Sequence, residues 1–435
     1  MKERVPASER TRKMIQDLLK GTAGEGATTS EFVRTAVRLM IEEALEAEVK
    51  DTLGRGYYES GAKDGDGYRN GYRTGRVKTA EGQVEYSAPQ VSDRQTPYES
   101  EIRRRLASRT EELERKAVEM YVRGLSTRDI EEVFRGEDGK SLLSRTAVSE
   151  VTERLWAEYQ AFASRDLSEF DIIYLFVDGI AERLHMGQPR EAVLCAWGFV
   201  SSGEKVLLHI APGTKEDTAS CRAFFQDLKN RGLKDPVLVA TDGAPGLIRA
   251  VEECFPRGRR QRCLAHKVRN LQNKVPEGEW PAIKAEILAC YQAASPALAR
   301  MLRDEFVRTH EKARPTLVSC FIDDFEACIA HLELPIHHRR ATRTTNLLER
   351  LFGEERRRTK VIPHAFGERA VLKLMYSSLI RASMRWKTIR VTEFERHQLD
   401  LLRRGQNEKF EESIQPATPA RVRPLSKDFS SKNRT

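Results

Sequence analysis

Two aspartates share one local setting in this sequence. Asp178 ends the apolar run of residues 172–177, Asp242 follows the apolar run of residues 237–240 after a threonine, and a glycine comes next in both places. A buried carboxylate is costly without a partner, and that partner is either a basic side chain or a metal ion. A single Asp-Gly is most often a turn or a helix cap. Two of them, each closing a predicted strand, favour a metal site.

Acidic side chains at the ends of neighbouring strands can converge on one edge of a sheet. Two carboxylates that close repel each other unless a cation lies between them, and Mg²⁺ or Mn²⁺ suits a site made of oxygen ligands. Glu349, in the segment "TTNLLERLF", is the candidate third ligand because it lies beside the apolar stripe of a predicted helix. From the residues alone, a salt-bridged surface glutamate explains Glu349 equally well.

The length and composition allow a globular protein of two to four domains. The charge balance allows a polyanion as a binding partner. The 435 residues include 74 Lys and Arg against 65 Asp and Glu, a net charge of +9. This moderate excess is compatible with nucleic acid. No apolar run is long enough to span a bilayer or form a signal peptide, and the seven scattered cysteines indicate reduced thiols. We therefore expect a cytoplasmic protein.

The centre of the chain predicts an α/β mixed sheet. Three β-rich runs at 171–180, 191–200 and 204–212 are joined by short links that suit antiparallel neighbours. A helix, the strand at 236–241, a second helix and a short run near "RQRCLAH" follow. Residues 267–340 are helical in pattern and punctuated by prolines, which fits a long helical insertion within an α/β domain.

The N-terminal part combines a helix with a region rich in Gly, Tyr and Arg. Thr28 and Glu31 fit a capping box, and Gly54 ends the helical pattern. Residues 77–86 are typical of a hairpin around Glu81-Gly82. Aromatic residues among cations suit a nucleic-acid surface, and a solvated loop fits equally well. The candidate DNA contacts in this region are Arg69, Tyr72 and Arg73.

Residues 112–165 are predicted to be helical. A helix is followed by Gly124 and by Ser126 as a new N-cap, and a further helix begins near Arg145. This order is typical of a helix-turn-helix, in which Arg145 and Thr146 would lie at the start of the helix that enters a DNA groove. An ordinary three-helix bundle has the same spacing.

Several motifs in order resemble the bacterial Mutator-type insertion-sequence transposases. They are "GYRNGYRTGRVKT" (67–79), "GLSTRDIEEVF" (124–134), "YLFVDGI" (174–180), "ATDGAPGLIRAV" (240–251), "QRCLAHKVRN" (261–270) and "TTNLLERLFGEERRRTK" (344–360). The likeness covers roughly residues 28–385, and the last three motifs together are specific. The N-terminal third matches less tightly, since "APQVSDR" (88–94) stands where the family often has Pro-Arg-Asp-Arg.

The resemblance implies a ribonuclease H-like mixed sheet core with a long all-helical insertion, preceded by helical N-terminal DNA-binding domains. It implies that Asp178, Asp242 and Glu349 form a DDE triad that holds two Mg²⁺ ions, for which Mn²⁺ can substitute. The expected parts are a mobile N-terminus (1–26), a helix and DNA-binding hairpin region (27–110), a helix-turn-helix domain (111–166), the first part of the core (167–266), the insertion (267–341), the second part with the Glu helix (342–412) and a disordered tail (413–435).

Cys263 and His266 form a Cys-x-x-His element just after the second aspartate. Zinc needs four ligands, and no second pair completes such a site. Because the family has this element at the same place, we interpret Cys263 and His266 as a pair that supports the active site, although simple packing also explains Cys263. The cationic run of Arg356, Arg357, Arg358 and Lys360 follows Glu349 and suits a DNA backbone, or else a solvated surface.

The predicted function is a DNA transposase that binds the terminal inverted repeats of an insertion sequence. In a two-metal mechanism the ions lie roughly 4 Å apart, water nicks the element's end, and the resulting 3′-hydroxyl attacks another phosphodiester. Because two ends must be held together, we expect a homodimer or larger assembly on double-stranded DNA in the nucleoid. A domesticated DNA-binding regulator without cleavage activity is the alternative. A serine recombinase would need a nucleophilic serine near an arginine cluster, for which no convincing candidate exists.

Overall fold

The computed structural model contains two compact units, each described here by itself. The first comprises residues 1–161 and 354–378, and the second comprises residues 162–353 and 379–435. The structure describes residues 5–20, 28–59, 66–106, 108–136, 139–182, 184–185, 188–213, 218–345, 353 and 367–414.

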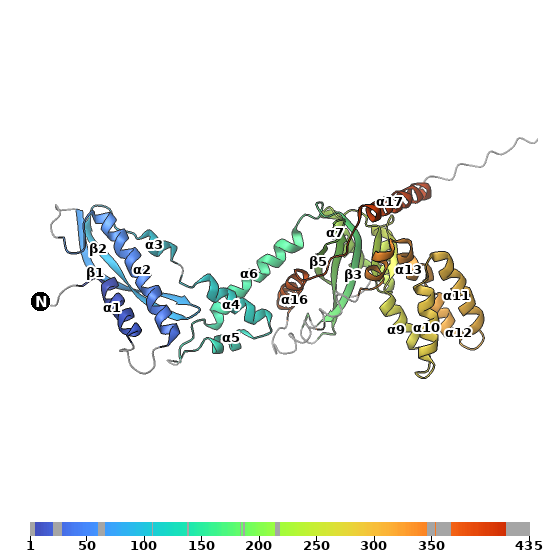
Figure 1. The fold of residues 1–435 in the computed structure, drawn as a ribbon, viewed down its shortest axis with the longest axis horizontal. Coiled ribbons are helices and arrows are strands. Elements are labelled where there is room, and N and C mark those ends of the chain that lie inside the picture. The colour runs from blue at the N-terminus through green and yellow to red at the C-terminus, as the bar shows by residue number, and fades with distance from the viewer. Residues whose placement is uncertain are drawn as a thin grey trace, which may run out of the picture. The chain divides into compact units, whose positions relative to one another are not determined.

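The first unit begins with helices and a long hairpin (Figure 1). Its elements are α1 (Ala7–Leu19), α2 (Thr29–Leu53), β1 (Asp66–Thr79), β2 (Gly82–Arg94) and α3 (Glu101–Arg105). The Thr28 side chain accepts a hydrogen bond from the backbone N–H of Glu31, and Gly54 ends α2 with a φ of 64° in the left-handed region. Both predicted ends of this helix are therefore confirmed.

The hairpin of β1 and β2 packs its apolar face on α2. Val77, Val84, Tyr86 and Ala88 are buried together with Leu45 of the helix. The predicted hairpin is confirmed, with strands that extend well beyond residues 77–86. Residues 68–73, whose polar composition allowed a solvated loop, lie on β1 instead, because cross-strand pairing holds their backbone.

Helix α1 corrects the expectation that residues 1–26 are mobile. Residues 7–19 form a helix whose Ser8 and Thr11 hydroxyls donate hydrogen bonds to Glu46 and Glu42 of α2, each at 2.5 Å. The face of α1 that docks is small and polar, whereas apolar residues such as Met14 and Leu19 are exposed, so the apolar pattern of the segment does not indicate how it docks.

Three helices follow in the first unit: α4 (Glu111–Val122), α5 (Thr127–Val133) and α6 (Arg145–Ser164). Ser126 is the N-cap of α5, as predicted, and it forms a complete capping box with Asp129. Leu374 of α16 (Glu368–Ser383) joins the apolar cluster of these helices, and Lys373 contacts Glu153 of α6 at 2.9 Å. Residues 367–378 thus pack with the helices of the first unit, although the sequence placed all of 342–412 in the catalytic core.

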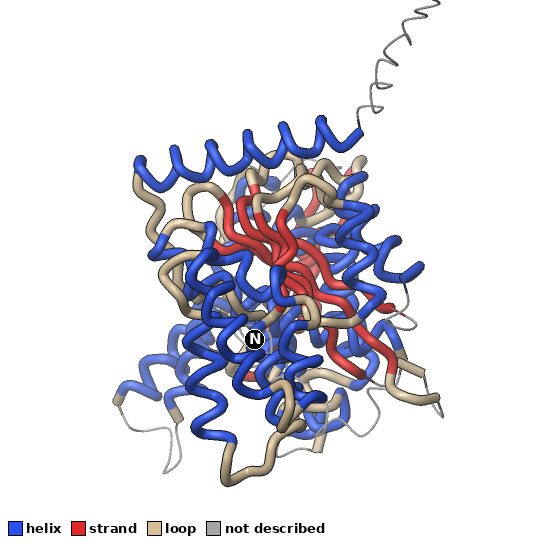
Figure 2. The backbone as a smooth tube through the Cα atoms, turned by 90° about the vertical axis from the view of Figure 1, so that its right-hand side faces the viewer, coloured by secondary structure: helices blue, strands red, loops and turns tan. Residues whose placement is uncertain are grey.

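The second unit is built on a five-stranded mixed sheet in the order β5-β4-β3-β6-β7. The strands are β3 (Ile172–Glu182), β4 (Glu191–Val200), β5 (Lys205–Gly213), β6 (Leu238–Thr241) and β7 (Arg259–Arg262). The first three are antiparallel, whereas β6 and β7 run parallel to β3. The predicted α/β fold with a mixed sheet is confirmed, and Figure 2 shows the strands in red among blue helices.

The two faces of the sheet carry different side chains, because successive residues of a strand point in opposite directions. Leu175 and Val177 of β3 pack with helices α7 (Thr218–Asn230) and α8 (Pro245–Cys254) on one face. The other face is aromatic, with the Phe176 ring stacked on Trp197 at 3.9 Å between centroids. On that face the Tyr174 hydroxyl bonds to His338 at 2.8 Å.

The predicted helical stretch after β7 is confirmed and has a core of its own. It contains α9 (Leu264–Gln272), α10 (Trp280–Tyr291), α11 (Pro296–His310), α12 (Pro315–Ile322), α13 (Phe325–Ile329), the 3₁₀ helix η1 (Ala330–Glu333) and α14 (Ile336–Thr342). Ile287 and Phe321 are among the fully buried side chains of this core. Helix α17 (Glu393–Ile414), which the sequence analysis did not predict, follows later in the chain.

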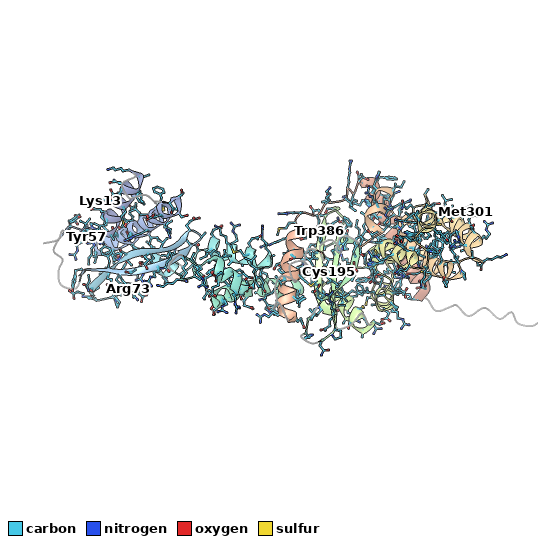
Figure 3. The ribbon with its side chains drawn as sticks, turned by 90° about the horizontal axis from the view of Figure 1, so that it is seen from below. Lys13, Tyr57, Arg73, Cys195, Met301 and Trp386 are labelled. Atoms are coloured by element: carbon cyan, nitrogen blue, oxygen red, sulfur yellow. The ribbon has the colours of Figure 1, made fainter. Side chains whose placement is uncertain are left out.

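All seven cysteines are free thiols, as predicted, and Cys195 lies within the sheet (Figure 3). Across the described residues, no helix combines the length and apolarity needed to cross a bilayer.

Candidate active site

Asp178 lies inside strand β3. The sequence placed it at the strand's end, but β3 continues to Glu182, because Gly179–Glu182 keep pairing with β4. The parallel ladder pairs Tyr174 with Leu238 and Phe176 with Ala240. Two residues further along the same register, Asp178 of the central strand β3 comes alongside Asp242, which directly follows the neighbouring strand β6.

Asp242 directly follows β6 and precedes helix α8. Its carboxylate accepts a hydrogen bond from the backbone N–H of Ala244 at 3.0 Å, and the Asp178 carboxylate accepts one from Gly179, also at 3.0 Å. Each aspartate therefore has one oxygen held by the backbone. This local bonding fixes the direction of both side chains.

The environment of Asp178 disfavours its charged form. Only 4 % of the residue is exposed, and burial raises the pKa of its carboxyl to about 7. The neighbouring Asp242 carboxylate adds to the rise, whereas His266 and the Thr345 hydroxyl lower the pKa. A buried carboxyl facing a second carboxylate is the setting that a bound cation would stabilise.

Cys263 and His266 lie beside this pair of aspartates. Cys263 follows β7 as the N-cap residue of α9, and its backbone N–H donates to the Thr241 carbonyl at 2.8 Å. Hydrogen bonding to Cys263 raises the pKa of His266 to about 9, and the Asp178 and Asp242 carboxylates contribute. Burial raises the pKa of Cys263, but hydrogen bonds from His266 and Thr345 outweigh burial and lower it.

The third candidate ligand, Glu349, lies outside the described residues. So do the cationic candidates Arg356, Arg357, Arg358 and Lys360. Over the parts of the chain that are described, no three His, Cys, Asp or Glu side chains are grouped to hold a metal ion. The aspartate pair therefore needs a ligand from elsewhere to complete such a site.

Thr345 lies next to the two aspartates and is the last described residue before Glu349 on this side of the chain. It is fully buried, its hydroxyl bonds to Asp178, and its backbone N–H donates to the Cys263 sulfur at 3.3 Å. Glu349 follows four residues later, so covalent connection keeps its Cα within about 14 Å of the Thr345 Cα. Sequence reasoning missed the contacts of Thr345, for which the sequence carries no signal.

The sequence profile described as "Transposase, Mutator family" matches residues 9–389. The chain belongs to this family. It is 32 % identical over 289 residues to the transposase for insertion sequence element IS6120 of Mycolicibacterium smegmatis, covering 66 % of this chain and 88 % of that protein. The transposase for IS406 of Burkholderia multivorans is 30 % identical over 361 residues, which is 82 % of this chain and 92 % of that protein. The transposase for ISRM5 of Rhizobium meliloti is 29 % identical over 356 residues, or 81 % of this chain and 88 % of its own length.

Two of the candidate DNA contacts in the first unit of this transposase have internal partners. The Arg69 guanidinium donates hydrogen bonds to the carbonyls of Arg55 and Gly56, at 2.8 and 2.9 Å. The Tyr72 hydroxyl donates to Glu46 at 2.8 Å and accepts from the Ala7 backbone N–H at 3.1 Å. Burial raises the pKa of Tyr72 above its ordinary value. These two side chains hold the loop after α2 and the start of α1 against the hairpin.

The other candidates in the first unit are accessible. Arg73 is exposed on the hairpin (Figure 3). Arg145 and Thr146 are exposed at the start of α6, where the Arg145 Nε atom lies 3.0 Å from Glu131. Near the hairpin, a groove of about 1150 Å³ is lined by several tyrosines and arginines: Arg10, Arg55, Tyr57, Tyr58, Tyr68, Arg69 and Tyr72. Cationic and aromatic side chains on one surface are suited to nucleic acid.

Proposed function

We propose that this transposase binds the terminal inverted repeats of an insertion sequence and cuts and joins DNA by a DDE two-metal mechanism. The observation that carries the proposal is the register of β3 and β6, which brings Asp178 alongside Asp242. Two carboxylates that lie side by side in a sheet repel each other and destabilise the fold unless a cation binds between them. Glu349 is the proposed third member of the triad.

The proposed fold of the second unit is a ribonuclease H-like core with a helical insertion. Three antiparallel strands followed by two parallel strands, in the order β5-β4-β3-β6-β7, support it. The insertion comprises the helices between residues 264 and 342, which separate Asp242 from Glu349 along the chain. The core thus supplies the two aspartates, and the chain that returns from the insertion supplies the glutamate.

The donor set fits Mg²⁺ or Mn²⁺. Asp178 and Asp242 offer hard carboxylate oxygens, and the raised pKa of Asp178 reflects a buried carboxyl that a cation would keep ionised. Asp178, Asp242 and Glu349 would hold two such ions, which lower the pKa of the attacking hydroxyl and stabilise the leaving oxygen. The imidazolium of His266 adds positive charge beside the aspartates, where it partly offsets their repulsion.

The proposed DNA contacts come from three places. Arg73 on the hairpin and Arg145 with Thr146 on α6 present exposed polar side chains to the inverted repeats. The run that contains Arg356, Arg357, Arg358 and Lys360 is proposed to hold the backbone near the cut. We propose that Arg69 and Tyr72 act mainly by shaping the groove, because their polar atoms are already engaged within the chain. A homodimer or larger assembly would hold the two ends together.

The test is a strand-nicking assay on DNA that carries the element's inverted repeats. Wild-type protein is expected to nick this DNA with Mg²⁺ or Mn²⁺ and not with EDTA. Asp178→Asn, Asp242→Asn and Glu349→Gln should each lower nicking at least a thousandfold, because each removes a charged metal ligand. A gel shift in EDTA should show unchanged DNA binding for all three.

Asp304→Asn, at an exposed acid on α11, is the matched control and should nick like wild type. Nicking that survives any one triad substitution removes that residue from the triad. Specific binding of the repeats by wild-type protein without any nicking would favour the alternative, a DNA-binding regulator derived from a transposase.

A further inference from the structure

The sulfur of Cys263 is a shared hydrogen-bond acceptor. The backbone N–H and the hydroxyl of Thr345 both donate to it, at 3.3 and 3.4 Å, and the His266 side chain is its third partner. Cys263 and Thr345 are both fully buried. Water therefore cannot replace these bonds, and the backbone N–H of Thr345 would be left without its acceptor if the sulfur were removed.

Cys263 also joins three chain segments at the candidate site. Its backbone N–H donates to the carbonyl of Thr241, the residue before Asp242. The next residue, Leu264, donates its N–H to the Arg343 carbonyl at 2.9 Å. The single hydroxyl proton of Thr345 can be donated either to the Cys263 sulfur or to the Asp178 carboxylate, so the residue lies within reach of both. The end of β6, the start of α9 and the segment 343–345 thus meet at one cysteine, with both aspartates adjacent.

We propose that Cys263 is a positioning residue whose sulfur, as the acceptor for Thr345, sets the starting point of the segment that leads to Glu349. This rests on the proposed function, in which Glu349 must reach the two aspartates. A neutral thiol is a weak acceptor, and an ionised donor or acceptor strengthens such a bond. Because Thr345 is fully buried, its backbone N–H has no water to bond to instead, so even a weak sulfur acceptor matters for the position of this residue.

Simple packing of a small apolar side chain is the competing explanation for a buried cysteine. It predicts that removing any fully buried cysteine of the second unit has the same effect. Cys221 of α7 is also fully buried and lies in the apolar core between the sheet and its helices. Cys221→Ala is therefore a control matched in volume and burial, while Cys263→Ser keeps an acceptor atom where Cys263→Ala does not.

The test compares the three variants with wild type in Mg²⁺-dependent nicking, DNA binding and thermal unfolding. Cys263→Ala should raise the Mg²⁺ concentration for half-maximal nicking at least fivefold and lower the maximal rate at least tenfold, with DNA affinity within twofold of wild type. Cys263→Ser should recover part of both losses, and Cys221→Ala should keep the wild-type Mg²⁺ dependence. Equal defects in Cys263→Ala and Cys221→Ala, or wild-type Mg²⁺ dependence in Cys263→Ala, would overturn the proposal.

Hydrogen–deuterium exchange separates this proposal from the proposed function. The Thr345 amide should exchange at least tenfold faster in Cys263→Ala than in wild type and Cys221→Ala, whether or not the protein cuts DNA. If wild type fails to nick and the exchange difference is present, the proposed function fails and the anchoring role stands. An unchanged Thr345 amide in Cys263→Ala overturns the anchoring role itself.

Discussion

The guanidinium group of Arg262 occupies the space that a β-carbon on Gly243 would need. A β-carbon added to Gly243 would lie 2.2 Å from the Nη2 atom of Arg262 and 2.4 Å from its Cζ atom. The φ of Gly243 is not positive, so the glycine is required here for a close approach rather than for a turn. The Nη1 atom of Arg262 is held by Asp323 at 3.2 Å, which links the residue after Asp242 to the helical insertion.

Gly243→Ala is therefore expected to impair nicking more than folding. The new methyl group must displace a guanidinium that Asp323 and the surrounding chain hold in place, and the shift acts directly on the neighbouring Asp242. We expect nicking to fall at least tenfold, with a loss of about 1–2 kcal/mol in the free energy of unfolding, typical of modest overpacking. Nicking rates and urea unfolding of the purified variant measure the two effects.

Gly278→Ala is the matched control, because a β-carbon there would meet nothing within 4 Å. It should nick and unfold like wild type. A Gly243→Ala protein with wild-type nicking would show that the position of Arg262 against Gly243 does not matter for Asp242.

The second prediction concerns pH and two buried histidines of the second unit. Burial lowers the pKa of His331 to about 4, helped by the charge of Arg343, and burial with the charge of Arg231 lowers the pKa of His209 to about 3. At pH values between these lowered pKa values and the ordinary pKa near 6.5, both histidines are protonated in the unfolded chain but not in the folded chain. Stability must therefore fall as pH decreases from about 7 to about 4.

From about 1.4 kcal/mol per pKa unit, each histidine should lower the free energy of unfolding by about 2 kcal/mol between pH 7.5 and pH 5. Urea unfolding of wild type, His331→Gln and the exposed control His397→Gln at both pH values tests this. His331→Gln should lose less stability on acidification than wild type, and His397→Gln should match wild type. An identical loss in all three proteins would contradict the assignment of a buried neutral His331.

Most of the sheet of the second unit could be predicted because β3, β4 and β6 are largely apolar, whereas β7 has the sequence Arg-Arg-Gln-Arg. A strand buried on both faces has a continuous apolar run, and residues 237–240 show one. The end of β3 could not be predicted in this way. Past Asp178 the strand is held by backbone pairing with β4, which leaves no mark in the residue types of Gly179 and Ala181.

The two aspartates of the candidate site were predictable from local pattern, whereas the contacts around them were not. Asp178 and Asp242 each follow an apolar run, and that pattern is visible in the sequence. Thr345 and Arg262 reach the site only through tertiary packing. The length of the helical insertion does not indicate where its two ends meet in the fold. Helix α1 was not predicted for a similar reason, because it docks through polar contacts such as the hydrogen bond from Thr11 to Glu42.

The third prediction separates two neighbouring arginines of the hairpin. Arg69 donates two hydrogen bonds to backbone carbonyls in the loop after α2, whereas Arg73 is exposed. If Arg73 contacts a DNA phosphate, Arg73→Ala should weaken binding and reduce the slope of log K against log salt by about 0.9. Its thermal unfolding should be unchanged, since the folded chain loses no buried contact.

Arg69→Ala should behave in the opposite way. The carbonyls of Arg55 and Gly56 lose their donors, so we expect a fall of about 1–3 kcal/mol in the free energy of unfolding. The salt slope of DNA binding should stay at its wild-type value, because the number of phosphate contacts is unchanged. Gel shifts at four salt concentrations, with thermal unfolding of the same samples, measure both quantities. A reduced salt slope in Arg69→Ala with wild-type stability would mean that Arg69 leaves its carbonyl partners to contact DNA.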